Sequence, residues 1–89
     1  MKTIYKYPLN SSWTKLNVPE ESKFLHFAIQ NGIPTVWIEV DFSKETTTVE
    51  FYIHGTGHSV GLNQKYLMTA MENGGEFVWH LYTAKVHLP

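Results

Sequence analysis

Hydrophobic and polar residues alternate with a period of two along most of this chain, and short turn-forming segments separate the alternating runs. A period of two places successive side chains on opposite faces of an extended strand, so each run can bury one face. The clearest runs cover residues 23–30, 35–42, 46–54 and 76–86, and Asn-Gly-Ile-Pro at residues 31–34 marks a turn between the first two. The pattern therefore predicts half-buried antiparallel strands.

The apolar faces of these runs supply the candidate core. Its members are Leu25, Phe27, Ile29, Val36, Ile38, Val40, Phe42, Val49, Phe51, Ile53, Phe77, Trp79 and Leu81. The runs within residues 24–30, 36–42 and 47–54 follow one another through short connections, which predicts a three-stranded meander. Two further strand candidates are residues 2–9 and 13–19, where Pro8 and Pro19 limit the pairing that each strand can make.

The segment between Gly61 and Gly74 departs from the period of two. Its apolar residues have helical spacing, and they are Leu62, Tyr66, Leu67, Ala70 and Met71. Residues 64–72 favour a helix by propensity, and the glycines after Asn73 suit a helix C-terminus. We expect a short helix here, with an irregular excursion as the alternative. The whole chain, residues 1–89, is then one small domain. We expect it to be all-β, or mainly β with one short helix, and its meander to form a sandwich or open barrel of about five or six strands.

Composition excludes several classes of function. The chain has no cysteine, so disulfides, thiolate zinc sites and cysteine nucleophiles are excluded. The formal net charge is −1 and the basic residues are scattered lysines, with no arginine, so nucleic acid is not an expected partner. No apolar run reaches the length of a membrane span, and the first residues lack the apolar core of a signal peptide. We expect a cytoplasmic protein without a membrane partner.

The polar faces of the runs are unusual because they are rich in Trp, Tyr and His. They carry His26, Trp37, Glu39, Asp41, Glu50, Tyr52, His54, His80 and Tyr82. Such side chains join an apolar body to a polar group, which is typical of ligand pockets and interfaces, although cross-strand packing alone also accounts for them. A domain of this size gains stability from self-association, so we expect a homo-oligomer.

Residues 54–61, with the sequence His-Gly-Thr-Gly-His-Ser-Val-Gly, form the most distinctive motif. Two histidines four positions apart align as metal ligands only on a helix, and here Gly55 and Gly57 redirect the chain between them. We therefore expect no metal ion and no cofactor. The glycines suit a loop whose backbone N–H groups cradle an anion such as phosphate, and they equally suit a plain turn.

Catalytic motifs in the sequence are weak. Ser59 follows His58 directly, but a nucleophile and its base meet in space and not along the chain. Glu39 and Asp41 share one strand face about 7 Å apart, a separation that could serve acid–base chemistry. Two solvated or ion-paired carboxylates are the simpler interpretation. We assign no catalytic residue and favour a protein without enzyme activity.

Four blocks of the chain resemble a family of small proteins from tailed phages and prophages. The blocks are Leu25–Gly32, Val36–Asp41, Gly55–His58 and Gly74–Tyr82, which contain the Gly-Thr-Gly-His and Gly-Gly-x-Phe-Val-Trp-His-Leu-Tyr sequences. The resemblance covers nearly the whole chain and implies a phage accessory protein. By analogy with unrelated small phage proteins that counter bacterial defence, it implies sequestration of a nucleotide-derived immune signal, of cyclic nucleotide or ADP-ribose type, in the host cytoplasm.

Such a protein needs no catalysis, because aromatic side chains can stack on a base while glycine N–H groups hold phosphate. The residues expected to bind this ligand are Trp37, His54, Gly55, Thr56, Gly57, His58, Trp79, His80 and Tyr82. The main alternative is a protein–protein inhibitor or structural accessory protein that docks a host or virion protein through its aromatic face. A hydrolase of the same signal is the third possibility.

Overall fold

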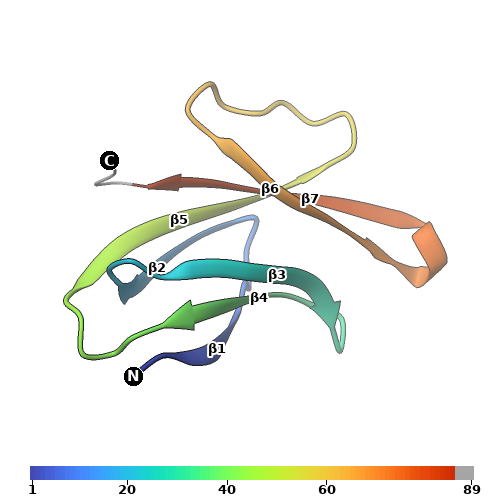
Figure 1. Cartoon of the computed structure of the whole chain (residues 1–89). Coiled ribbons are helices and arrows are strands. Elements are labelled where there is room, and N and C mark those ends of the chain that lie inside the picture. The colour runs from blue at the N-terminus through green and yellow to red at the C-terminus, as the bar shows by residue number, and fades with distance from the viewer. Residues whose placement is uncertain (86–89) are drawn as a thin grey trace.

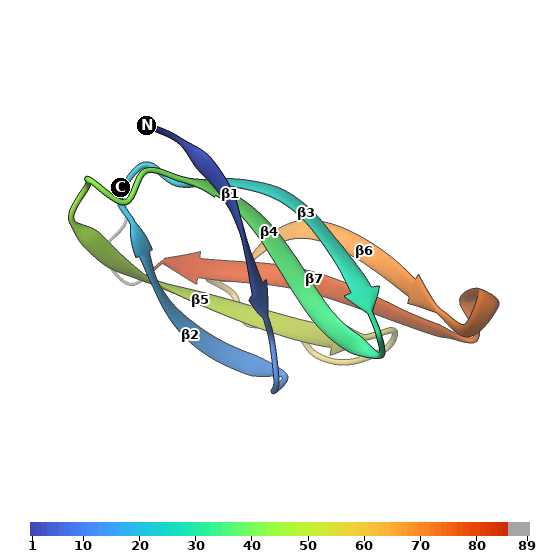
Figure 2. The same cartoon turned by 90° about the horizontal axis from the view of Figure 1, so that it is seen from below.

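A computed structural model describes residues 1–85 and consists of two antiparallel sheets packed face to face (Figure 1). Sheet A contains, in spatial order, β1 (Thr3–Pro8), β4 (Ile33–Val40) and β3 (Lys23–Gln30). Sheet B contains β2 (Trp13–Pro19), β5 (Thr46–Gly55), β7 (Phe77–Lys85) and β6 (Lys65–Glu72). Figure 2 shows β1, β4 and β3 side by side, with the strands of sheet B in the layer behind them. The predicted all-β sandwich is confirmed, and over the described residues its sheets do not close into a barrel.

The core lies between the sheets and is built from the apolar strand faces. Its buried hydrophobic residues are Leu9, Val18, Phe27, Val36, Ile38, Val40, Val49, Phe51 and Leu81. The alternation predicts most of these positions. It also predicts Phe42 and Phe77 in the core, but Phe42 lies beyond the end of β4 and is 57% exposed, and Phe77 is 44% exposed. A β-bulge between Phe24 and His26 changes the alternation at Leu25, so that Phe24 packs against the core in its place. Val86, expected at the end of the last strand, lies outside the described residues.

The turn at residues 31–34 forms as expected, but the three-stranded meander is wrong. Asn31 and Gly32 both have positive φ, at 52° and 77°, which is the geometry of a two-residue hairpin turn between β3 and β4. The next strand, β5, leaves this sheet and pairs with β2 and β7 in sheet B. Alternation identifies the buried face of a strand but not the strand beside it, so it could not distinguish these pairings.

The helix expected over residues 64–72 is also wrong, because this segment is strand β6. β6 pairs along its length with β7, and a β-bulge between Tyr66 and Met68 inserts Leu67 as an extra residue. Leu67 and Met68 therefore both pack against the core, which breaks the period of two and imitates helical spacing. The glycines after Asn73 form the turn between β6 and β7, where a short 3₁₀ turn, η1, spans Asn73–Gly75. Cross-strand pairing overrides the helix propensity of the segment, so the sandwich has seven strands rather than five or six.

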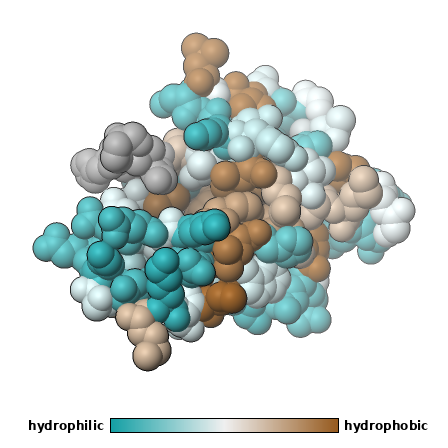
Figure 3. Space-filling view, viewed as in Figure 1, coloured by the Kyte–Doolittle hydropathy of each residue, from teal (hydrophilic) through white to brown (hydrophobic). Residues whose placement is uncertain are grey.

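The polar and aromatic residues that the alternating pattern assigns to one kind of face lie on two different sheets in the structure. Trp37 lies on the outer face of sheet A beside His26, with ring centroids 5.9 Å apart, whereas Tyr52, His54 and Tyr82 lie on the outer face of sheet B. Figure 3 shows hydrophobic residues gathered in the middle of one side of the molecule, with hydrophilic residues at the end where β4 leads into β5. No helix in residues 1–85 is both long enough and apolar enough to cross a membrane.

Candidate functional site

A cleft opens at the end of the sandwich where β5 continues past the start of β2. Trp13 pairs with Tyr52, and the backbone N–H of Ile53 donates to the carbonyl of Ser12 at 2.9 Å. Beyond Ile53, no strand within residues 1–85 pairs with this edge of β5. The β1–β2 connection and the β3–β4 turn border this free edge and enclose a cleft of about 640 Å³. That volume falls in the range of pockets that hold small molecules.

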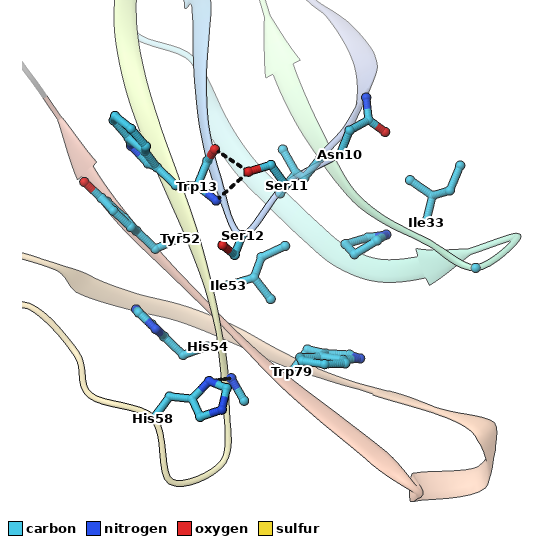
Figure 4. Close-up of a pocket in the computed structure, with 14 residues that line it drawn as sticks. Asn10, Ser11, Ser12, Trp13, Ile33, Tyr52, Ile53, His54, His58 and Trp79 are labelled. Atoms are coloured by element: carbon cyan, nitrogen blue, oxygen red, sulfur yellow. Dashed lines mark hydrogen bonds between the residues drawn. The ribbon is translucent and has the colours of Figure 1, made fainter.

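The residues that line the cleft lie on both sides of β5 (Figure 4). Trp13, Tyr52 and His54 lie on the outer side, Ile33 and Trp79 lie on the inner side, and Ile53 lies between the two groups. The lining residues are Leu9, Asn10, Ser11, Ser12, Trp13, Gly32, Ile33, Pro34, Tyr52, Ile53, His54, Gly55, His58 and Trp79. None of them is Lys, Arg, Asp or Glu, so an aromatic and apolar surface with a few hydrogen-bonding groups faces the space.

Carboxylates hold both tryptophans of the cleft in place. The indole N–H of Trp13 donates to Glu50 Oε2 at 3.0 Å, and the indole N–H of Trp79 donates to Glu72 Oε1 at 3.1 Å. Each bond satisfies the one polar group of its ring, which leaves only ring surface to contact a ligand. Such fixed aromatic surfaces lower the entropy cost of binding.

The Trp13 ring also lies nearly parallel to Tyr52, at an interplanar angle of 12° and a centroid distance of 6.4 Å. Burial, and then the nearby Glu50 carboxylate, raises the pKa of Tyr52 above its usual value, so its hydroxyl stays neutral at physiological pH.

His58 folds back against the end of β5 and forms the rim of the cleft. The Gly55 N–H donates to His58 Nδ1 at 3.2 Å, and the His58 N–H donates to the Gly55 carbonyl at 3.1 Å. Because Nδ1 accepts a hydrogen bond here, Nε2 is the ring nitrogen that carries a hydrogen in this arrangement. A Cβ atom at position 55 would lie 3.1 Å from His58 Cε1, so the glycine gives the ring room to pack on the strand end.

A family model described as Domain of unknown function (DUF7352) matches residues 1–88. The chain belongs to the DUF7352 family. No curated protein and no solved structure matches the chain in these comparisons.

The connection between β5 and β6 of this DUF7352 chain, residues 56–64, is fastened to the outer face of sheet B. Thr56 Oγ1 lies 3.0 Å from His80 Nε2, and His54 Nε2 lies 2.6 Å from Gln64 Oε1. His80 Nδ1 bonds in turn to Thr69 Oγ1 at 2.9 Å. Two histidines therefore hold the ends of this connection, and His58 holds its first turn.

Of the nine residues predicted to bind a ligand in this DUF7352 chain, eight lie around the end of β5. His54, Gly55, His58 and Trp79 line the cleft, as described above. Thr56, Gly57, His80 and Tyr82 lie in the β5–β6 connection or on the adjacent outer face of sheet B. Trp37 is apart from all of these, on the outer face of the other sheet.

The sequence patterns did not indicate that residues outside the strand runs and the Gly-Thr-Gly-His motif line the cleft. Trp13, Ser12 and Ile33 reach it because the β1–β2 connection and the β3–β4 turn end beside β5. No motif in the sequence singles out these three residues as part of a site.

Catalytic chemistry has little support from the geometry of the DUF7352 chain. Hydrogen bonds connect Thr56 to His80 and His80 to Thr69, in the order of a nucleophile, a base and an orienting group. The group in the orienting position is, however, a hydroxyl. In hydrolytic triads this position holds a carboxylate, which stabilises the imidazolium as it forms.

The two carboxylates considered for acid–base chemistry each have a partner. Lys2 Nζ lies 3.7 Å from Glu39, and the Ser43 hydroxyl and backbone N–H hold the pKa of Asp41 below its usual value. Asp41 is therefore kept ionised and is not prepared to act as an acid. Within residues 1–85, no group of three or more His, Asp or Glu side chains could hold a metal ion.

The loop of this DUF7352 chain depends on glycine at one position. Gly57 has a φ of +91°, a conformation that costs an L-residue about 1–2 kcal/mol. We expect Gly57→Ala to lower the free energy of unfolding by that amount, measured by urea denaturation. Gly57→Asn is the matched control, because asparagine tolerates left-handed backbone better, so its loss should be smaller. Equal losses for the two variants would contradict a backbone origin of the effect.

Proposed function

We propose that this protein binds and sequesters, without catalysis, a nucleotide-derived small molecule whose base enters the cleft at the end of β5. The observation that carries this proposal is the cleft itself, which is uncharged, bordered by two fixed tryptophans, and about 640 Å³ in volume. A planar heteroaromatic ring is the ligand group that such a surface favours, since stacking on one aromatic side chain contributes about 1–3 kcal/mol per base.

Aromatic side chains on both sides of β5 support a ligand with two ring systems. Trp79 and Ile33 offer apolar surface for a base on the inner side, and Trp13 and Tyr52 offer aromatic surface on the outer side. The linking part of the ligand would pass the free edge of β5, where the Nε2–H of His58 and the Ser12 hydroxyl are available as donors. Cyclic dinucleotides and ADP-ribose derivatives have this two-ring form.

Affinity in this proposal comes from the base and not from phosphate. No Lys or Arg lines the cleft, so a phosphate group would meet only histidine and neutral donors there. The resemblance to small phage proteins supports the most specific form of the proposal, in which the ligand is an immune signal that this protein removes from the host cytoplasm. Rigid binding without turnover suits that role, because the signal only has to be held.

Isothermal titration calorimetry with adenosine, guanosine, a cyclic dinucleotide and ADP-ribose tests the proposal. We expect at least one of the two-ring ligands to release heat, with its parent nucleoside binding more weakly but measurably in the same cleft. Chromatography of the ligand recovered after denaturation of the protein should show it unchanged. Absence of heat with every compound would overturn the proposal, and a chemically altered ligand would replace it with the hydrolase alternative.

A second candidate function rests on the outer face of sheet B. Its register places Trp13, Tyr52, Tyr82 and Tyr66 in one row across all four strands, and Trp13 and Tyr66 are each 52% exposed. A row of aromatic side chains of this kind suits docking of a host or virion protein. Tyr66→Ala should weaken such a complex and leave binding of a small molecule in the cleft unchanged, because Tyr66 does not line the cleft.

A further inference from the structure

Strand β1 is the edge of sheet A, and half of its backbone groups point away from the sheet. The N–H of Leu9 donates to the carbonyl of Pro34 in β4 at 2.8 Å, which fixes the alternation along β1. In an antiparallel pair, alternate residues bond to the neighbour while those between them face outward. The N–H and C=O groups of Ile4 and Lys6 therefore face the open side of β1.

The lysines near this edge do not extend their charged groups over it. Edge strands commonly avoid pairing with another chain by extending charged side chains over the edge. Here Lys6 Nζ donates to Gln30 Oε1 at 2.9 Å, and Gln30 belongs to β3 on the far side of β4. Lys2 Nζ likewise turns toward Glu39 in β4 at 3.7 Å. Both ammonium groups thus point back over sheet A.

Exposed aromatic and aliphatic side chains accompany the open backbone. Tyr5 is 51% exposed and packs against Tyr7 and Phe42, with ring centroids 5.2 Å and 5.4 Å away, and Phe42 is itself 57% exposed. On the opposite face of the strand Ile4 is 61% exposed. An edge with free hydrogen-bonding groups and apolar side chains on both faces favours the addition of another strand.

We propose that β1 pairs antiparallel with β1 of a second copy of this chain, so that two three-stranded sheets join into one continuous sheet. The outward N–H and C=O groups belong to alternate residues of β1. A two-fold axis sets these groups opposite the corresponding groups of the second copy, where the two sets can bond to one another. The outward groups of Ile4 and Lys6 can pair in three registers, with the axis centred on Ile4, Tyr5 or Lys6. Centring on Lys6 sets Lys6 opposite Lys6 of the second copy, and these like charges destabilise the pair, which leaves the registers centred on Ile4 and Tyr5.

Charge decides between these two registers. Centring on Ile4 places Lys2 opposite Lys6 of the second copy, and like charges in opposing positions destabilise a pair of strands. Centring on Tyr5 instead places Lys6 opposite Ile4 of the second copy. Ile4 pairs with Glu39 in β4, so this Lys6 lies in the same cross-strand row as a carboxylate of the other copy.

The Tyr5-centred register also brings the two Tyr5 side chains together. They form a pair without mutual backbone hydrogen bonds, in which opposing side chains are closest. The exposed Tyr5, Tyr7 and Phe42 clusters of the two copies would then merge, which covers the aromatic surface left open in one chain. Aromatic pairs of this kind stabilise cross-strand contacts.

A charge-exchange experiment on the purified protein tests this interface. Sedimentation equilibrium over a range of concentrations should give the wild-type protein twice the mass of one chain. Tyr5→Lys and Tyr5→Asp should each sediment as monomers, because each places like charges at the centre of the interface. An equimolar mixture of the two variants should recover the dimer mass, since the introduced ammonium group of one chain then faces the introduced carboxylate of the other.

Matched control variants test whether the loss of the dimer depends on the position of the substitution. Tyr66→Lys and Tyr66→Asp make the same changes at a 52% exposed tyrosine on the edge strand β6 of sheet B, and they should leave the dimer intact. Circular dichroism should show that the Tyr5 variants remain folded, since this side chain lies outside the core. A wild-type protein that is monomeric at every concentration, or a dimer that survives in Tyr5→Lys, would overturn the proposal. A mixture that stays monomeric would overturn the register.

Discussion

Phe27→Ala is expected to remove most of the stability of this domain. Phe27 is 1% exposed and is the largest of the fully buried side chains, on β3 between the two sheets. Truncating a buried phenylalanine costs about 3–5 kcal/mol, because apolar surface is lost and a cavity remains. A domain of this length is stable by only about 4–13 kcal/mol, at 0.05–0.15 kcal/mol per residue. Urea denaturation followed by circular dichroism should therefore show a much lower midpoint or no folded baseline.

Phe77→Ala is the matched control for this effect. Phe77 is 44% exposed on β7 and stacks on Trp79 at an interplanar angle of 18°. Losing such an aromatic pair costs about 1 kcal/mol. If both phenylalanine variants lost the same stability, the assignment of the core between the two sheets would be wrong.

Trp79→Ala is expected to weaken binding of a two-ring nucleotide by about 10- to 100-fold. Among the residues that line the inner side of the cleft, Trp79 has the largest flat ring, and base stacking on one aromatic side chain contributes about 1–3 kcal/mol. Calorimetric titration with the ligand that gives the strongest heat measures the change. Because Trp79 also packs against the core, circular dichroism must first show that the variant is folded.

Two further variants separate the role of Trp79 from a general loss of stability. Trp37→Ala makes the same chemical change on the outer face of sheet A, away from the cleft, and should leave the dissociation constant unchanged. His58→Ala removes an exposed rim residue and should raise the dissociation constant about threefold to tenfold, the value of one hydrogen bond. Equal weakening by Trp79→Ala and Trp37→Ala would place the site elsewhere.

Local patterns in the sequence predicted the strands well, because alternation depends only on which face of a strand is buried. Val36, Ile38 and Val40 are buried on β4 as the pattern predicts, and the Asn31–Gly32 turn has the backbone that these residues favour. The pattern failed at β6, where the inserted Leu67 shifts the register and gives the apolar residues a false helical spacing.

The candidate site was harder to predict because it depends on which strands become neighbours. The Gly-Thr-Gly-His motif directs attention to the end of β5 because the motif is local in the sequence, and two of its residues, Gly55 and His58, line the cleft. Trp13 joins it only because β2 pairs with β5 in a register that sets Trp13 against Tyr52. Trp37 shares the alternation of the other candidates but belongs to the opposite sheet, and no local pattern distinguishes the two sheets.

The position of β7 between β5 and β6 has a consequence for how the protein is made. β7 is the last of the seven strands that the structure describes in residues 1–85, yet it is an inner strand of sheet B and pairs with both neighbours. Until the ribosome has produced residues 77–85, β5 and β6 each lack the partner that they share. Sheet A, whose strands all end by Val40, has no such requirement. Completion of sheet B must therefore wait until this strand emerges, and a nascent chain stalled before it would expose unpaired strand edges to aggregation.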